Sequence, residues 1–509
     1  MKRGIIAAAM LSAFSQTSHA INWLQLENNE PQGSTNTAHF WGFVQPQLVH
    51  NDGGAVEGIA RPGQLAAYNG QDSLNNLVGP SFAHQNAVQV FRARPGLRGL
   101  MPGTNGKINY FLLAELGYNG ITVVKQSPDS FRYNPAITDA TITFNLPVTR
   151  VRVGLGRLPL GEEAMQGEPQ MNFANLTNVS DQLLNERFVS PYYSGRQEVP
   201  LLGVPMTQKV LPSGGVINAP LPGLQLQQAC AGAGNSNAFG AGKYCMGAIN
   251  NKPVGAFRDM GVEAYNWYNV GKMEYSYALM VSDGNGLQFA NNGNYDVSGH
   301  LQATYVFGGS GPTRQDATAY IWRQVGQRNY DGTNYSRIRE GLGARYSRNG
   351  LRVGGEYIKA AGMIYYGVIA PFLDIGTQPV GGATPFEPVD QMALASSNTA
   401  DGYYVDAGYR FLDKWEIDWR YDYLDKLKNS AYDERLFSTV TYGAQYFFSK
   451  NLRFLVNYEV RKISVANPTS YLLTSNANLR AAQQVQLEDA ATIGGSVGNR
   501  ITFGATYNF

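Results

Sequence analysis

Arginines recur at closely spaced, mostly alternate positions in two stretches of the chain. The stretches are "FRARPGLRG" and "RVRVG", and their arginines are Arg92, Arg94, Arg98, Arg150 and Arg152. Alternate side chains of a β-strand share one face, so each stretch predicts a row of guanidinium groups. A guanidinium group presents a fork of donors that suits carboxylates and phosphates. The spacing therefore predicts either a wall that attracts anions or a wall whose arginines pair with neighbouring acids.

Charged and apolar residues alternate in the second half of the chain as well. In residues 414–424, charges fall on one predicted face and aromatic or aliphatic side chains fall on the other. Arginines outnumber acids on the predicted inward faces, which indicates a modest preference for anions. With the five arginines above, the predicted pore-lining residues are Arg345, Arg420, Arg453, Asp418 and Asp422.

Sixteen segments of about ten alternating residues must position these charges. We predict strands at 38–49, 87–99, 107–118, 136–146, 149–160, 257–268, 272–282, 296–307, 316–327, 336–347, 351–363, 401–411, 414–424, 436–448, 452–463 and 500–509. Longer and shorter connections alternate between them, and the interval 328–335 is of intermediate length. This alternation is typical of outer-membrane barrels, which have long outer loops and short periplasmic turns.

The composition favours a membrane barrel over a soluble enzyme. Of 509 residues, 58 are Gly and 31 are Tyr, and only 15% are charged. A soluble β-sandwich also alternates, but it would not need charges on one face of nearly every strand. We therefore predict an all-β fold, a transmembrane antiparallel β-barrel of about 16 strands. The final strand "ITFGATYNF" would pair with the first to remove the sheet edge.

The N-terminus has the pattern of an export signal. A positive start at Lys2 and Arg3 precedes a short apolar run and the small residues of "SHA". This pattern predicts a signal peptide at 1–20, cleaved after Ala20, rather than a membrane anchor. The barrel would then occupy 21–509 in the outer membrane of a Gram-negative bacterium, after export through the periplasm. Because Lys2 and Arg3 account for the formal charge of +2, the remaining charges balance and indicate no nucleic-acid partner.

The third outer connection, residues 161–256, is the longest. It carries the charged residues Glu162, Glu163, Glu168, Asp181, Glu186 and Arg187, of which Glu162, Glu163, Glu186 and Arg187 are the predicted constriction residues. In a wide barrel, a loop of this length either folds inward as a constriction or stays on the surface as a solvated loop. It also contains Cys230 and Cys245, which predict a disulfide in an exported protein, the alternative being two free thiols.

Motifs for catalysis lack the context that they need. "GGSVG" matches a nucleophile motif but precedes a strand rather than a helix. "DGNGLQ" begins like a calcium loop and fails at its fifth position. Four histidines follow the signal peptide, and His300 has no evident Ser or Asn partner in the sequence. We predict that the chain is not an enzyme, and we predict no cofactor and no metal site.

Five stretches resemble the phosphate-selective porin O/P family of Gram-negative outer membranes. They are "FRARPGLRG", "ITDATITFNLP", "VRVGLGRLPLGEE", "RDMGVEAYN" and "YALMVSDGNG". The resemblance implies a sixteen-stranded barrel, a homotrimer and passive anion uptake along an arginine ladder. Arg92, Arg94 and Arg98 match the arginine-rich strand of that pattern. Arg152 and Arg157 match the second stretch, although the alternation places Arg157 on the outward face.

Two features depart from that family. The third loop is longer and contains the cysteines, and lysines are scarce near the predicted entrance. Both favour a general, weakly anion-preferring pore over strict phosphate selectivity. The expected partners are outer-membrane lipid, lipopolysaccharide and the barrel-assembly machinery. The alternative function is a non-conducting barrel, filled by residues 161–256, that serves as an adhesin or a structural scaffold.

Overall fold

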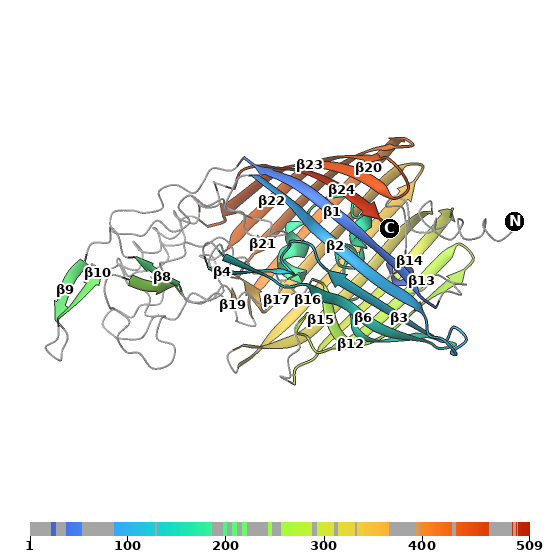
Figure 1. The fold of residues 1–509 in the computed structure, drawn as a ribbon, viewed down its shortest axis with the longest axis horizontal. Helices are drawn as coiled ribbons and strands as arrows, with labels where there is room; N and C mark the ends of the chain where they lie inside the picture. Colours follow the sequence, from blue (N-terminus) through green and yellow to red (C-terminus); the bar gives the residue numbers. More distant parts are fainter. Residues whose placement is uncertain are drawn as a thin grey trace.

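Sixteen of the described strands close into one antiparallel barrel (Figure 1). The computed structural model describes residues 22–26, 37–52, 86–127, 130–185, 197–200, 206–210, 216–220, 243–246, 256–287, 293–309, 314–330, 333–365, 392–393, 397–429, 434–467, 491, 495 and 497–509. The barrel strands are β1 (His39–Asn51), β2 (Asn86–Leu100), β3 (Ile108–Glu115), β6 (Ala136–Asn145), β7 (Arg150–Arg157), β12 (Arg258–Val270), β13 (Met273–Ser282), β14 (Asp296–Gly308), β15 (Gln315–Tyr330), β16 (Thr333–Arg348), β17 (Leu351–Ala361), β20 (Thr399–Leu412), β21 (Trp415–Lys426), β22 (Arg435–Phe447), β23 (Leu452–Val465) and β24 (Arg500–Asn508). Each predicted segment corresponds to one of them, so the predicted strand count is confirmed.

The alternation of side chains gives the barrel an apolar outside and a polar inside. On β21, Trp415, Ile417 and Trp419 are exposed, whereas Glu416, Asp418, Arg420 and Asp422 are buried. Successive side chains of a strand point to opposite faces, so this pattern follows directly from the sequence. The predicted faces of this strand are confirmed.

The last strand closes the barrel against the first. β24 pairs with β1 in antiparallel register, from Phe43 opposite Asn508 to Asn51 opposite Arg500. Beyond that ladder, the backbone N–H groups of Gly42 and Phe509 each donate to the other's carbonyl at 3.0 Å. The Phe509 ring lies 5.7 Å from the ring of Phe40, centroid to centroid. The apolar C-terminal strand therefore has no open edge, as predicted.

One end of the barrel holds seven short connections and the start of β1. An even number of strands brings the end of β24 back to that same end. At the opposite end, one connection is shorter than predicted. β15 and β16 extend to Tyr330 and Thr333, which pair with each other, so most of the interval 328–335 is strand. The predicted alternation of longer and shorter connections is wrong there, because the β15–β16 ladder continues to the tip of the hairpin.

Short elements complete the described chain. The helical ones are α2 (Trp23–Leu26), α3 (Glu162–Met165), the 3₁₀ turn η2 (Glu168–Gln170) and the π turn η3 (Ser180–Leu184). The paired short strands are β4 (Val123–Ser127) with β5 (Ser130–Tyr133), β8 (Gln197–Pro200) with β11 (Lys243–Met246), β9 (Met206–Val210) with β10 (Val216–Pro220), and β18 (Ile364–Tyr365) with β19 (Met392–Ala393).

In the described parts of the chain, no helix has the length and apolar character needed to cross a membrane.

An apolar core lies inside the barrel rather than between two layers. Residues 158–185, which we call the interior segment, follow β7 and carry α3, η2 and η3 through the space that the strands enclose (Figure 1). Its buried apolar residues pack against inward side chains of the wall, among them Phe91, Trp322, Leu424 and Phe437. The interior segment is therefore held by packing as well as by the polar contacts described below.

The face predicted for Arg157 is wrong. Its side chain is buried and contacts the interior segment instead of facing outward. The ladders of β7 with β6 and β12 keep a regular register, and Arg157 is the last residue of the strand. The buried interior segment begins at the next residue, Leu158, so the Arg157 side chain lies where the chain turns into the barrel. A period of two read from the sequence cannot anticipate where a strand ends.

Candidate functional site inside the barrel

Three arginines of the wall converge on one carboxylate of the interior segment. Glu168 accepts from Arg94 at 2.5 Å, from Arg157 at 2.5 Å and from Arg258 at 3.3 Å. Burial alone would raise the pKa of the Glu168 carboxyl, but Arg157, Arg94 and Arg258 hold that pKa well below its ordinary value. We call this group the Glu168 anchor. It joins β2, β7 and β12 to the interior segment.

Further contacts fix the wall side of the anchor. Arg94 also donates to Glu115 at 2.6 Å, and Arg258 donates to Asp139 at 3.0 Å. Arg157 donates to the carbonyls of Ala164 and Gln166 at 2.8 and 2.9 Å. Buried charges of this kind are tolerated only when paired and hydrogen-bonded. The sequence analysis singled out Arg94 and named Glu168 among the charges of the long connection. It missed Arg258, the inward turn of Arg157 and the meeting of Glu168 with three arginines.

The other predicted arginines of this side are also committed to contacts with the wall. Arg92 donates to Gln45 at 2.9 Å, and Arg98 lies over the ring of Trp41 at 5.7 Å. Arg152 pairs with Glu263 at 2.8 Å. Arg150 bonds to Asn266 and lies over the Trp267 ring at 3.9 Å. These side chains point inward as predicted, and each one has a neighbour that restrains it.

A small cavity separates the interior segment from the opposite wall. It has a volume of about 50 Å³. Glu162 and Glu163 border it on the interior segment, and Arg345, Arg352 and Arg420 border it on β16, β17 and β21. We call these five residues with their cavity the charged opening. Acidic and basic side chains thus border the same cavity.

Ion pairs cross the charged opening. Arg345 pairs with Glu162, and Arg420 pairs with Glu163 at 3.1 Å. Arg352 pairs with Asp406 and also with Asp418, at 2.6 Å to the latter. The sequence analysis named Arg345 and Arg420 as pore-lining residues and Glu162 and Glu163 as residues of the long connection, but it did not pair them.

Glu356 supports the opening from behind. Its carboxylate accepts from the Trp322 indole at 2.5 Å, from the Tyr404 hydroxyl at 3.0 Å and from the backbone N–H of Glu162 at 3.1 Å. Gly161 permits this approach, because a Cβ atom there would lie 2.1 Å from a Glu356 oxygen. The inward face of β17 therefore sets the position of Glu162. This carboxylate was missed as a site residue because its spacing resembles that of any inward acid.

The remaining predicted wall residues hold the interior segment. Arg453 donates to the carbonyls of Pro169 and Met171, both at 2.9 Å. Asp422 accepts from the backbone N–H of Asn178 at 2.9 Å and from its side-chain amide at 2.6 Å. These contacts occupy groups that the sequence analysis assigned to the pore lining.

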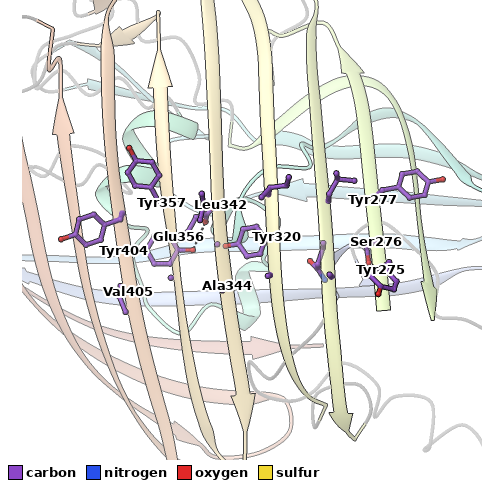
Figure 2. Close-up of a pocket in the computed structure, with 18 of the residues that line it drawn as sticks. Tyr275, Ser276, Tyr277, Tyr320, Leu342, Ala344, Glu356, Tyr357, Tyr404 and Val405 are labelled. Atoms are coloured by element: carbon purple, nitrogen blue, oxygen red, sulfur yellow. Dashed lines mark hydrogen bonds between the residues drawn. The ribbon is translucent and has the colours of Figure 1, made fainter. Parts of the chain in front are cut away.

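A second hollow lies on the outer surface, over β13–β20 (Figure 2). It has a volume of about 920 Å³ and an almost wholly apolar lining. Small residues form its floor in one continuous cross-strand row, namely Ala303, Ala319, Ala344 and Gly355. Exposed side chains such as Leu301, Ile321 and Leu342 border it. Tyr320, Ala344, Gly355 and Tyr404 line both this hollow and the cavity of the charged opening.

The structure leaves the predicted roles of Glu186 and Arg187 and the predicted disulfide of the long third connection as predictions. Glu186, Arg187 and Cys230 lie outside the described residues, and Cys245 is described only through the backbone of β11. The disulfide therefore stays a prediction. Within the described residues, no cluster of His, Cys, Asp and Glu is arranged to hold a metal ion.

No family model and no curated protein sequence matches the chain. Solved structures with a similar architecture include an anion-selective porin from Comamonas acidovorans, 12% identical over 93% of this chain and 100% of that chain, with a TM-score of 0.43. The outer membrane channel DcaP of Acinetobacter baumannii is 11% identical over 95% and 100%, with a TM-score of 0.43. OmpF of Salmonella typhi, solved with daunomycin, is 14% identical over 93% and 98%, with a TM-score of 0.44. Likenesses this remote do not establish what the chain does.

Proposed function

We propose that the chain is an outer-membrane porin that lets small hydrophilic solutes and ions diffuse passively through the barrel. The observation that carries this proposal is the charged opening inside a closed barrel with an apolar exterior. A barrel of sixteen strands is wide enough for an aqueous channel. The interior segment narrows it to a gap bordered by arginines on the wall and by Glu162 and Glu163 on the segment. Fixed charges at such a gap act directly on passing ions.

The proposed ion preference is weak and favours anions. Arg345, Arg352 and Arg420 supply positive charge at the opening, and Glu162, Glu163 and Asp406 balance it. This balance supports a general pore more than a dedicated phosphate channel, and the proposed anion preference rests on the excess of arginines on the predicted inward faces. Membership in the phosphate-selective porin O/P family remains part of this proposal and rests on the sequence resemblance.

Several associated expectations belong to the same proposal. The exposed aromatic and aliphatic side chains of the strands suit contact with outer-membrane lipid and lipopolysaccharide. The C-terminal strand that closes the barrel is the segment we expect the assembly machinery to read. A homotrimer, a cleaved signal peptide at 1–20 and the constriction role of 161–256 complete it. We propose no catalysis, since His300 donates to the Leu160 carbonyl at 2.8 Å and stacks on Tyr320, as a structural histidine would.

The second candidate function is a non-conducting scaffold or adhesin. It is favoured by the dense packing of the interior segment against the wall and by the small volume of the cavity at the charged opening. Purified protein in a planar bilayer separates the two functions. The porin proposal predicts stable conductance steps and, in a salt gradient, a reversal potential on the anion side. Folded protein that inserts without conductance steps would favour the scaffold and contradict the porin.

A further inference from the structure

The residues that follow the predicted signal peptide lie inside the barrel. The amide of Asn22 donates to Glu274 at 3.0 Å and to Ser276 at 2.7 Å, both on β13. The indole of Trp23 donates to Glu162 at 2.7 Å. These bonds join residues that are more than one hundred positions apart in the sequence. Residues 22–26, which we call the N-terminal segment, thus connect the β13 wall to the charged opening.

Apolar packing strengthens this placement. Trp23 and Leu24 are 4% and 3% exposed, and they form a cluster with Met165, Tyr265 and Ala278. Met165 belongs to the interior segment, whereas Tyr265 and Ala278 belong to β12 and β13. Burying a Trp and a Leu side chain removes apolar surface from water and is favourable. The N-terminal segment is therefore seated between the wall and the segment that narrows the barrel.

Trp23 also borders the charged opening itself. It lines the same cavity as Glu162, Arg345 and Arg420. Its N–H group uses Glu162, the carboxylate that also pairs with Arg345. A large, rigid ring at this place occupies space that water and ions would otherwise fill. A hydrophobic side chain at a constriction can block conduction in this way.

We propose that the N-terminal segment is a plug that binds in the charged opening and closes it. The proposal rests on the porin function proposed above, because a plug has meaning only in a channel. The occupant is a part of this chain, held by hydrogen bonds from Asn22 and Trp23 and by the packing of Trp23 and Leu24. Release would exchange these hydrogen bonds for bonds to water and would expose Trp23 and Leu24, so the packing favours the closed state.

Single-channel recordings of the full-length protein test the plug. We compare the wild type with a deletion of residues 22–26, with Trp23→Ala and with Trp23→Phe. The deletion should raise the unit conductance or the open fraction about twofold or more, because the ring no longer excludes water from the opening. Trp23→Ala should act in the same direction. Trp23→Phe keeps most of the ring but loses the donor to Glu162, so it should close less often than the wild type and more often than Trp23→Ala.

A peptide experiment tests binding of the segment separately. A synthetic peptide of residues 21–36 should restore closure of the deletion variant when it is added on the side of the barrel termini. A scrambled peptide of the same composition should not restore it. If the deletion variant conducts as the wild type does and ignores the peptide, the plug is wrong while the porin stands. If both proteins insert in folded form and neither conducts, the porin proposal and the plug fall together.

Discussion

The Glu168 anchor and the charged opening both pair arginines with carboxylates, but the two groups lie in different surroundings. In the anchor, one buried carboxylate lies among Arg94, Arg157 and Arg258, and each arginine has a further partner on the wall or the segment. In the charged opening, Arg345, Arg352 and Arg420 also have acidic partners, but their side chains border a cavity. Both groups therefore consist of arginine–carboxylate pairs, and they differ in that the pairs of the charged opening border a cavity.

This difference shows that an inward arginine is not by itself a transport residue. Buried ion pairs cost desolvation, and their contribution is to fix a geometry whose disruption is expensive. In the proposed channel, the charges at the opening would act on passing ions, because they border a cavity that the ions would enter. The anchor therefore holds the interior segment against the wall, and this placement sets where Glu162 and Glu163 lie at the opening.

The largest expected effect comes from breaking the anchor. Glu168→Gln removes the carboxylate and leaves three buried arginines with less compensation, which costs on the order of 3 to 5 kcal/mol when a buried pair is broken. The barrel ladders remain, so the cost should appear in the interior segment. Limited proteolysis should cut residues 158–185 much faster than in the wild type, and channel currents should become noisy.

Glu163→Gln provides the matched control for that variant. It removes one carboxylate from the same segment, but at the opening, where it pairs with Arg420 and accepts from Thr177. Its effect on proteolysis should be clearly smaller. Equal cleavage rates in the two variants would show that the anchor holds the segment no better than the opening does.

Acid should weaken the Glu168 anchor only at a pH well below the ordinary pKa of a glutamate. The folded pKa of Glu168 lies well below the ordinary value of about 4.3, so its stabilising contribution is present above that pH and is lost as the pH falls through the folded pKa. Protease resistance of the interior segment should be the same at pH 7 and near pH 4.5 and should decline only in stronger acid. Loss of protection already near pH 6 would contradict the anchor. The Glu168→Gln variant should lack this acid step.

A smaller effect is expected from a substitution at Asp422, a wall residue that binds Asn178 of the interior segment. Asp422→Asn keeps the shape but weakens the two hydrogen bonds from Asn178, at a cost of about 1 kcal/mol. Hydrogen exchange at Asn178 should accelerate while ion selectivity stays as in the wild type. A clear change in ion selectivity would show that Asp422 acts on ions, and would contradict its assignment to holding the interior segment.

The sequence predicted the strands well because period two is imposed by the backbone itself. Alternation along residues 414–424 and the closing strand at 500–509 needed no tertiary information. It failed at Arg157, where β7 ends and the chain turns into the interior segment, and at Tyr330 and Thr333, where a ladder continues to the hairpin tip. Both failures lie at the ends of strands.

The site was less predictable than the fold because it depends on the course of the interior segment, which has no repeating pattern of apolar and polar residues. The residue types of Glu162 and Glu163 suggested a constriction, but nothing in the sequence indicated that Glu168 would meet three arginines. The N-terminal segment was missed altogether, since Trp23 follows a predicted cleavage site and no pattern marks its destination. Contacts between residues so distant in sequence are set by the closed barrel.

The central claim, that arginines at the opening act on ions and arginines packed in the wall do not, is tested most directly by reversal potentials in a salt gradient. Arg345→Gln removes a charge at the opening, and Arg152→Gln removes one that pairs with Glu263 away from it. We predict that Arg345→Gln shifts the reversal potential toward cations and that Arg152→Gln leaves it unchanged. Equal shifts in both variants, or a shift in Arg152→Gln alone, would contradict the account.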